Sequence, residues 1–591
     1  MLHYAITIAD HGAHLFQVTI SIPTSSTTGH ILRLPAWIPG SYMIRDFARH
    51  IIDFRADSAQ QSLAFKTLDK QTWQLSPNQA EVQVSYKVYA YDLSVRSAYL
   101  ERDFAFFNHS SLCLSVDELA NSPCQLDVEC PADWQLATGL TRISGDKYAA
   151  GRFQADTYQQ LIDHPMLMGK LTIAEFNAAG VPHALVLAGR HYADLARICA
   201  DLQRICSTQI AMFGEQPPFA QYLFLTMVVG RGFGGLEHSN STALICNRKD
   251  LIHKNKSNID NDYRVFLSLC SHEYFHSWNV KTLKPKLFLP YQLDTEQYTP
   301  QLWFYEGFTS YYDDYLLHRA GLLSANAYLA ILGETIAKVQ RGKGHLRQSV
   351  AESSFYAWTK YYKQDENSPN AIVSYYAKGG LIALCVDLKI RLASQHQHDL
   401  AAVMADFWQR YGAQQDSADA GTDDNSFADF LRQRYDYQAI AAFVEQATQS
   451  TAILPLEELL EQFGITLTRA AAADDNTFSG KAVNSSLPVS LGAKYKVSNQ
   501  GLELTHVYEG EAASMAGLSA YDRIIAIDYL QVTDATLREI AERFKPGQTV
   551  TIHAFHRDEL REHQLTWQVP APQSLQLTVV AAEKLAGWLT L

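Results

Sequence analysis

The period of the hydrophobic pattern changes along this chain of 591 residues. Up to about residue 165, short alternating runs such as Tyr4–Ile8, Leu15–Ile22, Glu81–Tyr91 and Gln125–Glu129 lie between turns rich in Gly, Pro, Ser and Asn, which is typical of strands. From about 260 to 450, apolar residues recur every three to four positions, as in helices. A chain of this length folds into several domains. We therefore expect a multidomain α+β protein that begins with a β-sandwich-like domain.

The expected elements give approximate domain boundaries. Between residues 166 and 250 the pattern mixes a helix at Tyr192–Phe213 with strands at Gln221–Val229 and Thr242–Cys246. Near 450–490 the composition loosens, and we interpret Ala470–Ala473 and Asp474–Gly480 as a linker. The predicted domains are 1–165, 166–470 and 475–591. The helices predicted after residue 260 are Asp262–Trp278, Leu302–Ala320, Ala325–Arg341, Ala377–His396, Asp399–Tyr411 and Ser426–Tyr435, followed near the end by Leu537–Phe544.

Composition excludes several classes of protein. Hydrophobic residues make up 47% and charged residues 19%, which is the balance of a globular protein. The net charge is −13 and no basic run stands out, so neither nucleic acid nor an anionic membrane is an expected partner. The first residues lack the pattern of a secretory signal, no apolar run is long enough to span a membrane, and the eight cysteines are sparse. We expect a cytoplasmic protein with reduced cysteines.

The most informative motif for catalysis is Ser271-His-Glu-Tyr-Phe-His-Ser-Trp278. On a helix, His272 and His276 are one turn apart and face the same way, so two imidazoles can bind one metal ion. Glu273 follows the first ligand and can act as a base on the attacking water without occupying the metal. The alternative is a helix whose histidines are ordinary surface or core residues.

Glu306 is the candidate third ligand. It lies in Leu302-Trp-Phe-Tyr-Glu-Gly-Phe-Thr-Ser-Tyr311, where aromatic residues flank it on both sides. Burying a lone carboxylate among such residues is costly, and a bound cation removes that cost. Two histidines and one carboxylate favour one Zn²⁺ per chain, although cobalt or manganese can occupy similar ligands. Considered without the upstream histidines, Glu306 would be an ordinary surface glutamate.

These motifs resemble those of a known family. His-Glu-x-x-His followed by Trp-x-x-Glu-Gly-Phe is similar to the thermolysin-like metallopeptidases, in the branch that includes zinc aminopeptidases. Together with Pro35-Ala-Trp-Ile-Pro-Gly-Ser-Tyr42 and the C-terminal pattern, the whole chain resembles the glycyl aminopeptidase family. The resemblance implies an N-terminal β domain, a thermolysin-like and mainly helical catalytic domain, and a PDZ-like β domain. The two prolines of Pro35–Tyr42 indicate a rigid loop, which either packs domains together or takes part in binding.

The resemblance also assigns substrate contacts. Gly234-Gly235-Leu-Glu237-His238 is similar to the Gly-x-Met-Glu-Asn strand of zinc aminopeptidases, whose glutamate holds the substrate's free amine, although Leu and His replace Met and Asn. A carboxylate can pair with an ammonium and align the peptide backbone. The alternative is an ordinary acidic residue in a turn.

The second assigned contact is a tyrosine. Ser374-Tyr-Tyr-Ala-Lys-Gly-Gly380 resembles the Tyr-x-Lys-Gly segment of the same enzymes. The resemblance makes Tyr376 the donor to the oxyanion of the tetrahedral intermediate, with Tyr375 as the adjacent candidate. A phenol suits this task because it can donate a hydrogen bond to developing negative charge.

The C-terminal sequence is similar to PDZ domains of bacterial proteases. The matching segments are Gly501–Val507, Gly510–Leu518 and Asp522–Asp528, and Leu491-Gly492 is the candidate loop for binding a carboxylate. Such domains capture peptide C-termini by strand addition. A degenerate module that serves only for packing is the alternative.

The combined prediction is a zinc aminopeptidase with peptide substrates. Family resemblance implies a preference for small N-terminal residues, glycine or alanine. Two alternatives stay open: a zinc endopeptidase of narrow specificity, which would use the same metal site without an amine anchor, and a peptide-binding scaffold that acts through its PDZ-like domain.

Overall fold

The computed structural model describes residues 1–414, 420–483, 485–585 and 587–590. The chain forms two compact units, each of which combines segments that are distant in sequence. The first consists of residues 1–297 and 404–423, and the second of residues 298–403 and 424–591. Among the described residues, no helix is both long and apolar enough to cross a membrane. All eight cysteines are free thiols.

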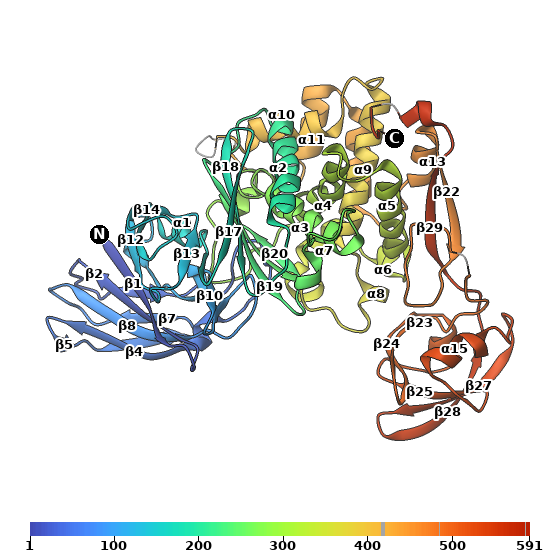
Figure 1. Ribbon diagram of the computed structural model, residues 1–591, viewed down its shortest axis with the longest axis horizontal. Helices are drawn as coiled ribbons and strands as arrows, with labels where there is room; N and C mark the ends of the chain where they lie inside the picture. The colour runs from blue at the N-terminus through green and yellow to red at the C-terminus, as the bar shows by residue number, and fades with distance from the viewer. Residues whose placement is uncertain (415–419, 484, 586, 591) are drawn as a thin grey trace. The chain divides into compact units, whose positions relative to one another are not determined.

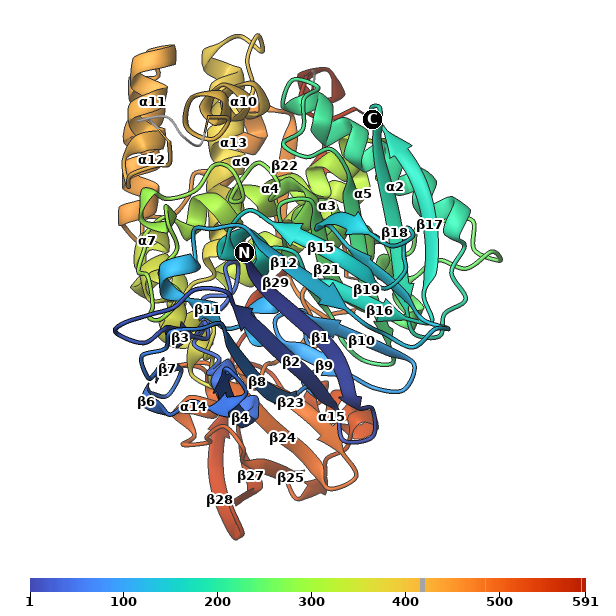
Figure 2. The ribbon, with the colours of Figure 1, turned by 90° about the vertical axis from the view of Figure 1, so that its left-hand side faces the viewer.

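The first unit begins with an eight-stranded sheet in the order β14-β15-β12-β1-β2-β8-β4-β5. Strand β2 alternates strictly between half-buried and buried residues, as its sequence predicts. The strands β1, β2 and β8 run side by side in Figure 2. The bounds are β1 Leu2–Asp10, β2 Leu15–Ile22, β4 Ile51–Ser58, β5 Gln61–Ser62, β8 Val82–Tyr89, β12 Cys124–Val128, β14 Thr141–Ser144 and β15 Gly151–Ala155.

Two four-stranded sheets complete the N-terminal region, in the orders β13-β16-β10-β9 and β11-β3-β7-β6. Their strands contribute to one hydrophobic core together with the eight-stranded sheet. The β-rich N-terminal domain expected from the alternating pattern is therefore confirmed. The bounds are β3 Ile31–Arg33, β6 Phe65–Asp69, β7 Thr72–Leu75, β9 Ala98–Leu100, β10 Phe104–Phe107, β11 Ser115–Val116, β13 Gln135–Thr138, β16 Met166–Gly169 and the short helix α1 Tyr158–Ile162.

A five-stranded sheet follows in the order β17-β18-β19-β21-β20. Its edge strand β20 is formed by the glycine-rich segment that begins at Gly234, and it pairs antiparallel with β21. Helix α3 packs against β20 and β21. The bounds are β17 Thr172–Ala178, β18 Val181–Ala188, α2 Leu195–Met212, β19 Tyr222–Val229, β20 Gly234–Glu237, β21 Ser241–Asn247 and α3 Asn261–Phe275.

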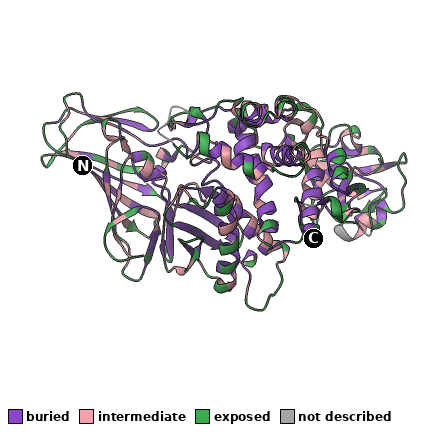
Figure 3. Ribbon diagram, turned by 90° about the horizontal axis from the view of Figure 1, so that it is seen from above, coloured by how far each residue is buried: buried purple, intermediate pink, exposed green. Residues whose placement is uncertain are grey.

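The part of the chain between residues 298 and 462 is mainly helical, as predicted. Buried residues concentrate along its central helices and along the strands of the sheets, while exposed residues lie on loops and outer turns (Figure 3). The helices that begin between residues 300 and 460 are α4 Leu302–Arg319, α5 Ala325–Gln340, α6 Gly344–Arg347, α7 Val350–Phe355, α8 Ser368–Ala371, α9 Tyr375–Ala393, α10 Leu400–Tyr411, α11 Ser426–Tyr435, α12 Gln438–Gln449 and α13 Leu456–Gln462.

The first two residues of the predicted linker belong to a strand. Strand β22, Ile465–Ala471, forms an antiparallel ladder with β29, Pro572–Val579, near the end of the chain. Its local sequence gave no clear strand pattern because most of its residues face outwards and its pairing partner is distant in sequence. Strand β29 also packs along helix α5.

Between β22 and β29 lies a segment with its own hydrophobic core, residues 487–567, here called the C-terminal module. Its sheet has the order β23-β24-β25-β27-β28, with β26 paired to β25 and helix α15 against the sheet (Figure 1). Helix α15 begins and ends three residues before the predicted helix Leu537–Phe544. The bounds are β23 Ala493–Ser498, β24 Gly501–Val507, α14 Ala512–Met515, β25 Arg523–Ile527, β26 Leu530–Gln531, α15 Asp534–Ala541, β27 Thr549–His556 and β28 Glu559–Thr566.

Candidate functional site

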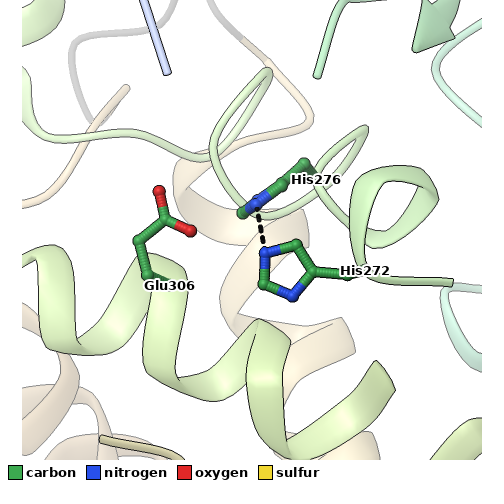
Figure 4. A group of neighbouring side chains, drawn as sticks. All are labelled: His272, His276 and Glu306. Atoms are coloured by element: carbon green, nitrogen blue, oxygen red, sulfur yellow. Dashed lines mark hydrogen bonds between the residues drawn. The ribbon is translucent and has the colours of Figure 1, made fainter. Parts of the chain in front are cut away.

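Helix α3 carries the two predicted histidine ligands. Asp260 caps its first turn by accepting a hydrogen bond from the Tyr263 amide at 2.9 Å, which fixes where the helical register begins. His272 lies in the last turn of the helix, and His276 is its C-cap. The two Nε2 atoms lie 3.1 Å apart (Figure 4). Both rings therefore direct the same nitrogen towards one point.

The backbone sets the tautomer of His276. Its Nδ1 lies 2.8 Å from the carbonyl oxygen of Asn279, and a carbonyl can only accept, so Nδ1 carries the proton. The lone pair of a neutral ring is then on Nε2, the nitrogen that faces His272. A carbonyl behind a ligating histidine is the usual outer contact of metal sites, because it orients the ring and raises its basicity.

Glu306 lies near the two histidines. It lies in the second turn of α4 and is only 2% exposed. One ligand atom from each of Glu306, His272 and His276 lies within 4.8 Å of those of the other two, and Figure 4 shows the three side chains converging. The predicted third ligand is thus near the predicted pair. A carboxylate this deeply buried is costly unless positive charge compensates it.

Two glycines bring α9 close to the helix that carries Glu306. A Cβ added to Gly307 would lie 2.6 Å from Cα of Gly379, and one added to Gly379 would lie 2.6 Å from the carbonyl oxygen of Trp303. Any side chain at either position would force the two helices apart. The glycines of Glu-Gly-Phe and Lys-Gly-Gly therefore allow the close backbone contact between the two helices.

The start of α9 holds Tyr376 beside Glu306. Ser374 caps the helix by accepting from the Ala377 amide at 3.1 Å. Burial, and then the negative charge of Glu306, raise the pKa of Tyr376 well above its ordinary value. The phenol consequently keeps its proton and can donate it in a hydrogen bond. Tyr375, the adjacent candidate, is fully buried.

A second phenol near Glu306 was not anticipated from the sequence. Burial raises the pKa of Tyr361, the charge of Glu306 raises it further, and its hydroxyl lies 3.0 Å from the Ser374 hydroxyl. Its ring stacks on that of Tyr376, with centroids 5.5 Å apart. No local pattern marks Tyr361, because it lies in a short helical turn outside any motif.

Glu273 faces the edge strand β20. It is 5% exposed, and a Cβ added to Gly235 would lie 2.6 Å from its Cγ and overlap its carboxylate. Only glycine at this position lets the strand pass so close to the carboxylate. The Gly235 carbonyl in turn accepts a hydrogen bond of 3.2 Å from Arg96 of the N-terminal region. Gly234 and Gly235 thus form the strand edge beside the candidate base.

Glu237 ends β20 and is also buried, with 5% exposure. One carboxylate oxygen lies within 4.8 Å of ligand atoms of both Glu273 and His276. The predicted amine anchor, the predicted base and one predicted metal ligand are therefore neighbours. Two carboxylates this close create a strongly negative locus, which favours a cation such as an ammonium group.

The loop Pro35–Tyr42 contacts the same glutamate. Gly40 has φ of +87°, and a Cβ there would lie 2.5 Å from Oε2 of Glu237. Trp37 anchors the loop by donating from Nε1 to the carbonyls of Gln292 and Thr295 at 3.0 and 2.9 Å. The loop therefore packs against a site residue. The sequence left its packing and binding roles open, and only its rigidity was predicted.

His238 lies in a separate buried charge group. It approaches Asp163 at 3.5 Å, and Lys281 contacts the same carboxylate at 2.5 Å. Burial disfavours the charge of Asp163, but Lys281 and then His238 keep its pKa well below the ordinary value. Burial and the charge of Lys281 lower the pKa of nearby Lys284 to about 7. These groups line a cavity of about 680 Å³ that also meets Ile38 and Pro39 of the loop.

Comparison with known proteins identifies the chain. Family models match residues 3–170, as the M61 N-terminal domain, and residues 265–382, as the M61 glycyl aminopeptidase. A solved structure of an aminopeptidase N family protein from Idiomarina loihiensis is 53% identical over all of both chains, with a TM-score of 0.97. The chain belongs to the M61 glycyl aminopeptidase family. It is a metallopeptidase, as the His-Glu-x-x-His string predicted.

More distant structures of this metallopeptidase fold include the M1 zinc metallopeptidase of Deinococcus radiodurans. The two are 12% identical over 77% of this chain and 94% of the other, with a TM-score of 0.50. At this identity the likeness concerns the fold alone. No curated protein matches the chain in sequence.

The donor set of the M61 enzyme fits zinc. Two nitrogens bound tetrahedrally at about 2.0–2.1 Å are about 3.3 Å apart, close to the separation of the two histidine Nε2 atoms. Two imidazoles and one carboxylate leave a fourth position open, which is the arrangement of catalytic zinc. Glu306 supplies the negative charge, so the site is also electrostatically suited to a divalent cation.

Proposed function

We propose that this M61 metallopeptidase is a zinc aminopeptidase that holds one Zn²⁺ on His272, His276 and Glu306. The proposal is supported by the convergence of the three donors within 4.8 Å and by the outer hydrogen bond of His276. When bound, zinc supplies Lewis-acid polarisation of the scissile carbonyl and of the attacking water.

The roles of the protein groups follow from their positions. Glu273, held against β20, accepts the proton of the attacking water and delivers it to the leaving amine. Tyr376 remains protonated because of burial and of Glu306, so it donates a hydrogen bond to the developing oxyanion.

Glu237 accounts for cleavage after the first residue. Its carboxylate pairs with the free α-amine of the substrate and sets the distance from the amino end to the scissile bond. The loop around Gly40 closes on the same carboxylate and limits the space beside it. This crowding agrees with the small first residue, glycine or alanine, that family resemblance implies.

The remaining parts of the proposal concern organisation. We retain the three-domain division at 1–165, 166–470 and 475–591 and the cytoplasmic location as predictions. For the C-terminal module we propose a PDZ-like role in binding peptide C-termini, since strand β23 lies at the edge of its sheet and the loop Leu491–Gly492 directly precedes that strand.

The observation that carries the aminopeptidase assignment is the proximity of Glu237 to Glu273 and His276. The test is hydrolysis of glycyl and alanyl reporters, each with a free and an acetylated amine, by the wild type and by Glu237→Gln. We expect the wild type to cleave free amines only, and the variant to show a KM raised roughly ten- to a hundredfold, the value of a charge-assisted hydrogen bond. Glu129→Gln, at an exposed position, is the control.

The other outcomes identify the alternatives. Equal cleavage of acetylated reporters would indicate an endopeptidase. A zinc-loaded wild type that hydrolyses neither series would favour an endopeptidase of narrow specificity or the peptide-binding scaffold. Unchanged kinetics in Glu237→Gln would remove Glu237 from the amine site while leaving the metallopeptidase assignment intact.

A further inference from the structure

The C-terminal module presents a sheet edge and a loop of the kind that binds peptide ends. Among the described residues, strand β23 stands at the end of the strand order and pairs with β24, so its outer side is where an added strand would pair. The amides of Leu491 and Gly492 directly precede this strand. Recognition of a peptide C-terminus requires both: free amides for the carboxylate and a free edge for the peptide backbone.

The amides of the loop are already in use. The carboxylate of Asp475 accepts a hydrogen bond of 3.0 Å from the Leu491 amide and another from the Ser490 hydroxyl. The Gly492 amide donates to the Ser490 hydroxyl oxygen at 2.9 Å. Asp475 is 4% exposed, so its carboxylate is buried in the loop. A carboxylate of the chain thus lies where a peptide carboxylate would bind.

The free edge of β23 is also in use. The side-chain amide of Asn476 donates to the Tyr495 carbonyl at 3.0 Å and accepts from the Tyr495 amide at 3.0 Å. A single primary amide here makes the same pair of hydrogen bonds that a backbone residue of an added strand would make. The neighbouring residues Asp475 and Asn476 therefore imitate the two recognised parts of a peptide end, the carboxylate and the backbone.

Surrounding contacts hold these two residues in place. Asp474 accepts from the amides of Asn476 and Thr477 at 2.9 and 2.7 Å, which forms a tight turn. Gln573 donates from Nε2 to the carbonyl of Asp475 at 3.2 Å. Arg341 in turn donates from Nε to Gln573 at 2.8 Å, and it also pairs with Glu511 of the module at 2.8 Å. The segment is thus tied to the helical part of the same unit.

We propose that Asp475 and Asn476 are an internal ligand that closes the peptide-binding edge of the C-terminal module. The partner that fits the edge is the C-terminal end of an extended peptide, whose carboxylate replaces that of Asp475 and whose backbone replaces the Asn476 amide. The inference rests on the proposed PDZ-like role of the module. It adds that the full-length enzyme does not bind such peptides until this segment is displaced.

The test compares the full-length wild type with Asp475→Ala/Asn476→Ala. The probe is a library of labelled, N-acetylated decapeptides with four randomised residues at a free C-terminus, and the same library amidated. We expect the double variant to bind free-carboxylate peptides at least tenfold more tightly than the wild type does, with no gain for amidated peptides. Asn499→Ala, at an exposed position of the same module, is the control and should behave as the wild type.

Hydrogen exchange provides a second measurement that does not need a peptide. The amides of Leu491 and Tyr495 should exchange slowly in the wild type and at least tenfold faster in the single variants Asp475→Ala and Asn476→Ala, respectively. The single variants keep the test valid if the double variant does not fold.

Three results would overturn the inference. Equal, carboxylate-dependent binding by wild type and variants would show an open edge and would preserve the peptide-binding role of the module. Absence of binding by every variant would overturn both the inference and that role. Fast exchange of the Leu491 and Tyr495 amides in the wild type would show that the internal contacts do not hold in solution.

Discussion

The metal-site region and the C-terminal module treat their binding groups in opposite ways. Around the metal site, glycines at 235, 307 and 379 clear space so that side chains converge on one point. In the module, the Leu491 amide and the backbone groups of Tyr495 are hydrogen-bonded to Asp475 and Asn476 of the same chain. Both regions resemble known binding architectures in sequence, but in the module these groups already have hydrogen-bond partners within the chain.

The difference shows that a sequence motif identifies the binding groups that are present but does not tell whether a ligand can reach them. Removing a side chain should therefore lose function in the metal-site region and gain binding in the module. The following predictions examine this contrast, beginning with the largest expected effect.

The strongest test in the metal-site region is Glu273→Gln. The amide keeps the size of the side chain but cannot accept the proton of water, so kcat should fall by about 10²–10⁴. Metal content should remain that of the wild type, because Glu273 is not among the proposed ligands. Hydrolysis rates and metal analysis on the same sample measure both quantities. A variant with wild-type kcat would show that the buried carboxylate has no part in proton transfer.

Tyr376→Phe should have the next largest effect. Loss of one oxyanion donor lowers kcat by about 10²–10³ with a smaller change in KM. Tyr361→Phe is the matched comparison, since Tyr361 lies near the same glutamate but its hydroxyl contacts Ser374. Steady-state kinetics of both variants would assign the donor, and a larger loss in Tyr361→Phe would exchange the two roles.

A structural test concerns the contact between α4 and α9. Gly379→Ala should destabilise the enzyme by about 1–3 kcal/mol, because the new methyl group meets the Trp303 carbonyl and separates the helices. Gly380→Ala is the control: its Cβ would lie 3.3 Å from the Gly307 carbonyl oxygen, a contact that a small shift relieves. Urea unfolding measures both, and equal stability of the two variants would argue against a close helix contact at Gly379.

The smallest effect concerns the internal ligand of the module. Burial raises the pKa of Asp475 to about 6, so between pH 4 and 6 the folded state binds more protons than the unfolded state. The free energy of unfolding should accordingly rise as the pH falls from about 6 towards 4, by less than about 1.4 kcal/mol per pH unit. Asp475→Asn should lack this dependence. Thermal unfolding of both proteins at several pH values is the measurement, and parallel curves would contradict it.

Sequence alone predicted the groups that depend on local spacing. His272 and His276 follow from helical periodicity, and Glu306 from an acidic residue among aromatic ones. The β-rich start and most helices follow from the hydrophobic period. The contact of Gly40 with Glu237, the position of Tyr361 and the pairing of Asp475 with Leu491 were not predictable, because each joins residues that are distant in sequence and carry no shared pattern.

The ladder of β22 and β29 has a consequence for the chain as a polymer. Ala471 lies opposite Pro572, so the segment between them leaves and re-enters the fold at adjacent points. While the module is folded, it holds the two ends of the inserted segment close together. Pairing β22 with β29 then costs no additional loop-closure entropy. If the module unfolds, the ladder must close a flexible loop of roughly 100 residues, which costs about 3 kcal/mol more than a four-residue turn. Such a loop is long but tolerable, so the ladder can persist after the inserted segment has melted.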